Sequence, residues 1–269
     1  MPHDPSYQHI LYERRGRIAL VTLNRPDKLN AWTGLMENEF IDAVNRTAAD
    51  ASLAVLVVTG AGRGFCAGAD ISGWSQDLTA GGGQPRAASP LEARDGSPEV
   101  PIALSRGKPA IAAINGPSIG IGLTMPMACD IRIASDKATF SARFVKVGLT
   151  PECGSTRYLP LVAGLPNALF LAMTGRIIDA NEAKERGLVD RVVPHDTLLD
   201  EAMALAEEIA ANPTNAVWGA KRMMHENANE SDLRRVTTEE VHMIREMRRL
   251  PDHAEAVQAF MEKRPPKFQ

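Results

Sequence analysis

AAINGPSIGIGLTMPMACD, residues 112–130, is the stretch that decides how this chain folds. It opens with the end of a short apolar strand, Pro109–Ile114, which stops at an Asn-Gly pair. Gly116, Gly120 and Gly122 follow, and then comes a run of helix formers. A strand that ends in glycines and continues as a helix leaves backbone N–H groups unpaired in the first helical turn. Together with the positive end of the helix dipole, these groups favour an anion or an oxygen that gains negative charge.

Length and composition limit the classes of protein that the chain can belong to. Its 269 residues, 44% of them apolar, suffice for one large domain or a domain with an appendage. Lys and Arg number 30 against 33 Asp and Glu, with no basic stripe, so nucleic acid is not an expected partner. Cys66, Cys129 and Cys153 are far apart, which argues against a disulfide framework or a zinc site and favours a reducing compartment. Because we find neither a signal-peptide pattern nor an apolar run of about 18 residues, we expect a cytoplasmic protein without a membrane partner.

Predicted strands and helices alternate as far as residue 195, and only helices are predicted after it. Thr33 is expected to cap a helix that reaches about Asp50, and Asp179 with Glu182 forms a capping box for another helix. The predicted strands are Gln8–Glu13, Arg17–Leu23, Leu53–Thr59, Pro109–Ile114, Ile131–Ser135 and Val189–Val193. This order indicates an α/β core over residues 1–195 and a helical region over 196–269.

The stretch Ser72–Val100 fits this alternation least well. It contains three consecutive glycines, several prolines and scattered charges. Since structureless loops of this length are uncommon unless they are functional, we predict a lid or a pocket wall with a short helix.

Four motifs in this order resemble the enoyl-CoA hydratase/isomerase (crotonase) family. They are NRPDKLNA (24–31), GRGFCAGADI (62–71), AAINGPSIGIG (112–122) followed by ACDIRIAS (128–135), and GLTPECGS (148–155). The resemblance covers nearly the whole chain, including its ending FMEKRPPKF. It implies the α/β, ClpP-like crotonase spiral of ββα units, with a helical C-terminal region used to form a homo-oligomer, a trimer or a dimer of trimers.

The resemblance gives the glycine-rich turns a chemical role. In this family an acyl-CoA thioester is held with its carbonyl oxygen between two backbone N–H groups, so that an enolate can form. By motif position these donors are Ala69 in AGAD and Ile121, which follows Gly120 in IGIG. Each such donor is typically worth ~2.7–4 kcal/mol, so two would supply roughly 5–8 kcal/mol of enolate stabilisation.

The resemblance also implies a set of residues that bind coenzyme A, which is part of the substrate and not a separate cofactor. No metal is implied. The positions are Lys28, Leu29 and Ala31 in the first CoA loop, Ala67, Asp70 and Ile71 beside the adenine pocket, and Phe260 and Lys263 on the terminal helix. Lys28 and Lys263 also suit phosphate groups chemically. Asp70 additionally has the sequence context of a helix N-cap.

The acid or base that is present decides the reaction. Hydratases of this family place one Glu after the second glycine run and another on the following segment, and the two together activate a water molecule. Alignment on the family puts Thr124 at the first position and Phe144 at the second, and neither can act as a base. Glu152 in TPECGS instead stands where peroxisomal-type Δ3,Δ2-enoyl-CoA isomerases and related bacterial isomerases carry their single acid.

One carboxylate suffices to take a proton from C2 and return it to C4 of a dienolate, whereas water addition benefits from two. The apolar neighbours Leu149, Pro151 and Cys153 are expected to raise the pKa of Glu152 and so help it to shuttle protons near neutral pH. The sequence therefore predicts an isomerase of unsaturated acyl-CoA. A hydratase that uses Glu152 with an unidentified partner, and another enolate reaction such as ring isomerisation, stay open.

Two readings outside this chemistry are also open. Residues 116–120 match the G-x-S-x-G elbow of serine hydrolases, with Ser118 as nucleophile and Asp190 and His195 following in the required order. A non-enzymatic protein that merely keeps the CoA pocket is the other alternative. Activity, not binding, would separate it from an isomerase.

Overall fold

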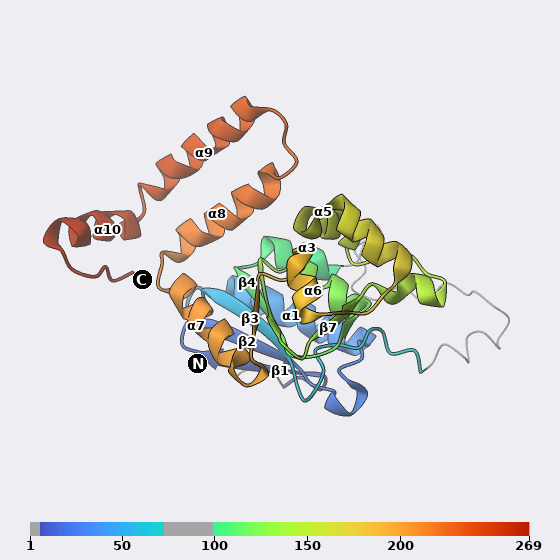
Figure 1. Cartoon of the computed structure of the whole chain (residues 1–269). Helices are drawn as coiled ribbons and strands as arrows, with labels where there is room; N and C mark the ends of the chain where they lie inside the picture. Colours follow the sequence, from blue (N-terminus) through green and yellow to red (C-terminus); the bar gives the residue numbers. More distant parts are fainter. Residues whose placement is uncertain (1–5, 73–98, 269) are drawn as a thin grey trace.

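The computed structural model describes residues 6–72 and 99–268, and its centre is a six-stranded sheet (Figure 1). The strand order is β1-β2-β3-β4-β6-β9; β1 is antiparallel to β2, and every later pairing is parallel. The strands are β1 (Ile10–Arg15), β2 (Ile18–Leu23), β3 (Val55–Gly60), β4 (Ala110–Ile114), β6 (Ile131–Ser135) and β9 (Arg191–Val193). Every predicted strand is present, with ends that differ by up to two residues. The predicted lid falls mostly on residues 73–98, which lie outside the described residues.

Alternate residues of the central strands face two separate apolar clusters. On β3, Val55 and Val57 pack with the cluster under α7, whereas Leu56 and Val58 pack with the larger cluster under α1. β2 and β4 divide their side chains in the same way. This is the period of two expected of extended chains, and a parallel sheet covered on both faces needs apolar side chains at every position.

Helices cover both faces of the sheet and then continue beyond it. The helices are α1 (Gly34–Ala49), α3 (Glu99–Arg106), α4 (Ile121–Thr124), α5 (Ser155–Thr174), α6 (Ala180–Glu185), α7 (Leu198–Ala210), α8 (Thr214–Asn227), α9 (Leu233–Met247) and α10 (Pro251–Glu262). Short 3-10 turns are η1 (Pro26–Lys28), η2 (Pro126–Ala128), η3 (Arg143–Val147) and η4 (His195–Thr197). Among the described residues, no helix is long and apolar enough to cross a membrane.

Two of the predicted caps are present in the structure. The Thr33 side chain accepts a hydrogen bond from Met36 N at 3.1 Å, and the Asp179 side chain accepts one from Glu182 N at 2.8 Å. Both helices therefore begin where a short polar side chain can satisfy an unpaired N–H group.

A second, three-stranded sheet lies beside the first in the described part of the chain. It consists of β5 (Ser118–Ile119), β7 (Thr139–Ser141) and β8 (Ile178–Asp179), in the order β5-β7-β8. β5 was not predicted, and the run of helix formers after it gives only the single turn of α4. The helix is short because Pro126 starts the tighter turn η2 and has no N–H group to continue an α-helical ladder.

The last two helices lie beyond the α/β body, and α8 connects them to it. Figure 1 shows α8 and α9 as a hairpin, with α10 beyond α9. α7 covers the sheet, because Leu198, Ala202 and Ala206 pack against it. α8 is bonded to the body through Lys221, which donates to Leu104 O and Lys108 O, whereas α9 and α10 leave the body.

Candidate active site

The two glycine-rich turns meet at the carboxyl edge of the parallel sheet. β3 runs into residues 60–68 and β4 runs into residues 115–120. Cys66 pairs with Ser118 in parallel fashion, through Cys66 N to Pro117 O at 2.9 Å and Ile119 N to Cys66 O at 3.0 Å. The carboxyl ends of parallel strands are a common location for ligand sites, and here two turns with exposed backbone adjoin each other.

Two buried asparagines, which the sequence analysis did not single out, hold these turns in place. Asn30 donates to Ala61 O at 2.9 Å and Gly64 O at 2.8 Å. Asn115 donates to Gly62 O at 2.9 Å and accepts from Gly60 N at 3.2 Å. Both lie inside the recognised motifs, but only the folded chain shows that their amides bind the neighbouring turn.

The backbone N–H of Ala69 points away from the strand beside it. Trp32 N donates to Gly68 O and Asp70 N donates to Trp32 O, each at 2.8 Å, so this bridge uses both polar groups of Trp32 and neither of Ala69. Successive peptide groups of an extended segment point to opposite sides. The Ala69 amide therefore faces the side on which Cys66 pairs with Ser118.

Ile121 lies on that side, as the first residue of α4. Leu123 N and Thr124 N both donate to Gly120 O. The N–H of Ile121, in the first turn of the helix, has no acceptor within the helix. The backbones are close: a Cβ built on Gly120 would lie 3.7 Å from Gly68 Cα. The two amides predicted to bind a thioester oxygen thus come from adjacent turns.

Glu152 reaches the same region from the loop between η3 and α5. Thr124 Oγ1 donates to Glu152 Oε1 at 3.4 Å, and Thr124 is completely buried, whereas Glu152 is exposed. Cys153, at φ 58°, and Gly154, at φ 69°, are consecutive left-handed residues that follow the carboxylate. This turn buries the cysteine and leaves the glutamate at the surface of the site.

The apolar enclosure expected around Glu152 is not formed by the described residues. Cys153 is buried, but Glu152 itself and Leu149 are exposed. The reason is the left-handed turn, which sends neighbouring side chains in different directions. Burial instead affects the thiol of Cys153. Desolvation, and then the nearby carboxylates of Glu152 and Glu37, raise the pKa of Cys153 well above its usual value.

Comparison with known proteins places this geometry in a family. A family model described as enoyl-CoA hydratase/isomerase matches residues 13–269. The chain belongs to the enoyl-CoA hydratase/isomerase family. It is 36% identical over 255 residues to the 1,2-epoxyphenylacetyl-CoA isomerase of Escherichia coli (strain K12), covering 93% of this chain and 94% of that protein. It is also 36% identical over 263 residues to a probable enoyl-CoA hydratase of Mycobacterium bovis, covering 98% of each.

Solved structures agree with this assignment. The crystal structure of a putative enoyl-CoA hydratase from Streptomyces coelicolor A3(2) superposes with a TM-score of 0.89 at 30% identity, covering 100% of this chain and 97% of that chain. A probable enoyl-CoA hydratase/isomerase from Mycobacterium abscessus gives 0.83 at 35% identity, covering 97% and 99%. The chain therefore has the crotonase fold and is an enzyme of the acyl-CoA type, as the sequence predicts.

The loop predicted to bind CoA, residues 28–31, lies beside Ala67. Ala67 N donates to Leu29 O at 3.0 Å, Ala31 N donates to Lys28 O at 3.0 Å, and the Lys28 side chain is exposed. Ile71 is 57% exposed at the end of the same segment. These predicted CoA positions are thus brought together by the structure.

Asp70 has structural partners in this loop. Its carboxylate accepts from Arg25 Nη2 at 2.9 Å and from Ser72 N at 3.1 Å. Hydrogen bonds from Ser72, followed by that from Arg25, lower the pKa of Asp70 to about 2. The bond from Ser72 N is that of a cap or turn, while the helix that Asp70 was expected to begin falls outside the described residues.

Phe260 and Lys263 lie apart from the other predicted CoA residues within the single chain. They are at the end of α10, and Figure 1 shows this helix beyond the α8–α9 hairpin. Phe260 is 82% exposed. A single chain therefore does not bring them to the first CoA loop.

Phe144 occupies the second hydratase position and is a core residue. It lies on η3, is 9% exposed and belongs to the larger apolar cluster. The environment at this position is therefore apolar.

The structure contradicts the serine-hydrolase alternative. Ser118 is completely buried and donates to Gly122 O at 2.7 Å. Asp190 accepts from the Arg132 backbone N–H at 2.7 Å, and His195 Nδ1 is 3.0 Å from Ser135 Oγ. Each of the three residues therefore binds another partner. Ser118 lies in β5, whose neighbouring residues form ladder bonds with Cys66.

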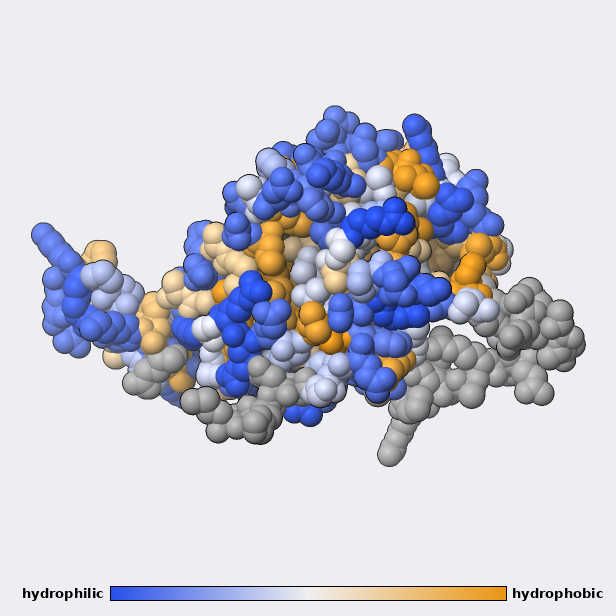
Figure 2. All heavy atoms as spheres, turned by 90° about the horizontal axis from the view of Figure 1, so that it is seen from below, coloured by the Kyte–Doolittle hydropathy of each residue, from blue (hydrophilic) through white to orange (hydrophobic). Residues whose placement is uncertain are grey.

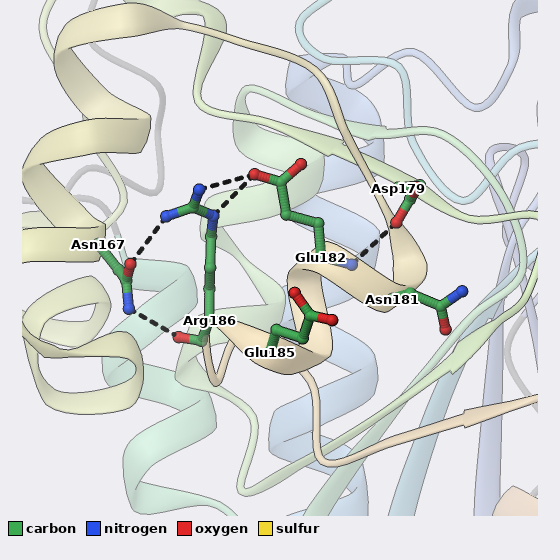
Figure 3. A pocket seen from close by; sticks show the side chains of 6 residues that line it. All are labelled: Asn167, Asp179, Asn181, Glu182, Glu185 and Arg186. Carbon is green, nitrogen blue, oxygen red and sulfur yellow. Dashed lines mark hydrogen bonds and ion pairs between the residues drawn. The ribbon is translucent and has the colours of Figure 1, made fainter.

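A polar pocket elsewhere has no part in this site. It has a volume of about 540 Å³ and lies between α5 and α6 (Figure 3). Arg186 lines this pocket and donates to Glu182 Oε1 at 2.7 Å and to Asn167 Oδ1 at 2.9 Å. Its guanidinium stacks on Phe170. Asn167, Glu182 and Arg186 are bound to one another, and Asp179 accepts from Glu182 N, so this pocket is a structural contact between two helices.

Proposed function

We propose that this enzyme isomerises the double bond of an unsaturated acyl-CoA, with Glu152 as its single acid and base. The observation that carries the proposal is the contact between Thr124 Oγ1 and Glu152 Oε1. Thr124 ends the one-turn helix that Ile121 begins, so the carboxylate lies beside the turn whose amide is predicted to bind the thioester oxygen.

In the proposed reaction Glu152 removes a proton from C2 of a 3-enoyl-CoA. The electron pair of that C–H bond moves into the thioester, and the resulting dienolate oxygen accepts hydrogen bonds from the amides of Ala69 and Ile121. The protonated Glu152 then gives its proton to C4, and the double bond ends between C2 and C3. Both amides stabilise charge that develops only in the reaction, which is the kind of interaction that accelerates it.

The residues at the two hydratase positions support isomerisation over hydration. Thr124 and Phe144 carry no carboxylate, and Phe144 lies in the apolar core. A water molecule held for addition to the double bond would lack its second carboxylate there. The names of the relatives are divided between isomerase and hydratase, so the discrimination depends on the side chains of this chain.

The test is Glu152→Gln, assayed with paired 3-enoyl-CoA and 2-enoyl-CoA substrates whose products are resolved by mass and NMR. General base catalysis normally contributes ~10²–10⁴-fold, so we expect isomerisation to fall by at least about 100-fold. Activity within about tenfold of the wild type would exclude Glu152 as the base. Efficient formation of 3-hydroxyacyl-CoA from crotonyl-CoA by the wild type would favour a hydratase instead.

We further propose that the enzyme assembles as a homo-oligomer, a trimer or a dimer of trimers. The supporting observation is the exposure of large apolar side chains on the helices that leave the body, such as Leu233 at 72% and Met261 at 75%. A second copy of the chain would cover them.

A further inference from the structure

We propose that Thr124 is the positioning residue of Glu152, holding its carboxylate at a fixed place relative to the amide of Ile121. The inference rests on the proposed role of Glu152 as acid and base. Thr124 does not accept the proton itself; it positions the carboxylate that accepts it.

The geometry begins with the one-turn helix α4. Its first residue is Ile121 and its last is Thr124, and the backbone of Thr124 is fixed because its N–H donates to Gly120 O at 3.0 Å. The hydroxyl of Thr124 donates to Glu152 Oε1 at 3.4 Å. A single rigid turn thus connects the predicted oxyanion donor to the carboxylate.

The side chains of Thr124 and Glu152 differ in burial and in the number of rotamers open to them. Thr124 is 0% exposed, and β-branched side chains have few rotamers. Glu152 is exposed, and a glutamate side chain has more rotatable bonds than a threonine side chain. A donor that is itself immobile restricts the carboxylate to the rotamers that face α4.

The backbone after Glu152 contributes to the same restriction. Cys153 has φ 58°, which is unusual for a residue other than glycine, and its buried thiol is anchored in the core. Strained backbone of this kind is often found next to functional side chains. The Thr124 contact, at 3.4 Å, is long for an O–H···O bond, and catalytic hydrogen bonds of this length commonly tighten when substrate binds.

The thiol of Cys153 is the titratable group next to this contact in the described chain. The carboxylates of Glu152 and Glu37 and the thiol of Cys129 all act on it. The Thr124 hydroxyl also hydrogen-bonds this thiol, so one buried hydroxyl joins α4 to both Glu152 and the residue that follows it.

The experiment compares Thr124→Val with Thr124→Ser in 3-enoyl-CoA isomerisation. For Thr124→Val we expect kcat to fall about 10- to 100-fold with KM within about threefold, because a misplaced catalytic group costs rate rather than binding. Thr124→Ser keeps the donor and should retain kcat within about threefold. Thr47→Val is the matched control, because Thr47 is equally buried and donates to Ala43 O, away from the site. Thr124→Ala replaces Thr124→Val if that variant fails to fold, and the same loss is expected.

Combination with Glu152→Gln separates this inference from the proposed function. If Thr124 acts through Glu152, the double variant should be no slower than Glu152→Gln alone. A wild-type kcat in Thr124→Val, with Glu152→Gln inactive, would overturn the positioning role and leave the proposed function intact. Independent, additive losses would also overturn it. Full activity of Glu152→Gln would overturn both.

Discussion

At the scale of single residues, the site depends on close approach between two backbones, and Gly122 and Gly116 are where this is tightest. A Cβ on Gly122 would overlap the carbonyl oxygen of Cys66, which is itself held by Ile119 N. We expect Gly122→Ala to push the two turns apart, to lower stability by about 1–3 kcal/mol as overpacking does, and to reduce kcat by about tenfold or more. Urea unfolding and steady-state kinetics measure the two effects.

Gly16→Ala is the control for that substitution. Gly16 lies in the β1–β2 turn at φ 60° with open space around it, so alanine there costs backbone strain only, about 1 kcal/mol. Its kcat should be unchanged. A Gly122→Ala enzyme with normal kcat would show that the spacing of the turns is not required for activity.

At the scale of elements, α8 is held to the body by a buried ionic cluster. Lys221 is 7% exposed, lies 2.9 Å from Asp130 and donates to Leu104 O and Lys108 O. His225 Nε2 is 3.0 Å from the other oxygen of Asp130. Burial by itself would raise the pKa of Asp130, but His225 and Lys221 outweigh it and hold the pKa below its usual value.

Removal of Lys221 should therefore be costly. We expect Lys221→Met to lower the free energy of unfolding by about 3 kcal/mol, because breaking a buried pair leaves its partner charge less compensated. Arg222→Met on the same helix is the control: its pair with Glu226 spans 3.9 Å and is mostly exposed, so a change within about 0.5 kcal/mol is expected. Equal effects of the two variants in urea unfolding would contradict the anchoring role of Asp130.

Elements whose signals are local were predictable from the sequence. Strand Ile131–Ser135 has the predicted bounds, and the caps at Thr33 and Asp179 form as expected. In both caps the deciding hydrogen bond joins residues three positions apart.

Features that depend on distant partners were not predictable. The two-residue strand β5 exists because it pairs with β7 and Cys66, and nothing in its own sequence indicates a strand. α5 starts at Ser155 and bends at Gly164. The motifs identified Glu152 and Thr124 separately, but their contact required the fold. The residue types of the candidate site were therefore predictable, whereas their neighbours were not.

At the scale of the whole molecule, the central sheet buries its apolar side chains more completely than the helices that leave the body. The central strands are almost entirely buried, and Figure 2 shows apolar side chains on one face of the molecule in separate patches among hydrophilic ones. On α9, by contrast, exposed Leu233, Val241 and Ile244 fall on one side of the helix. Apolar stripes of this kind are typical of surfaces that another chain covers.

Assembly is the prediction that belongs to this scale. At micromolar concentration we expect light scattering to give the mass of a trimer or hexamer, and Ile244→Glu to shift it toward the monomer, because a carboxylate buried in an apolar contact is unfavourable by several kcal/mol. His242→Glu is the control, since 100° per residue puts exposed His242 on nearly the opposite side of α9, where the same charge should leave the mass unchanged. A monomeric wild type would refute the assembly, and an unchanged mass for Ile244→Glu would exclude the α9 stripe as its contact surface.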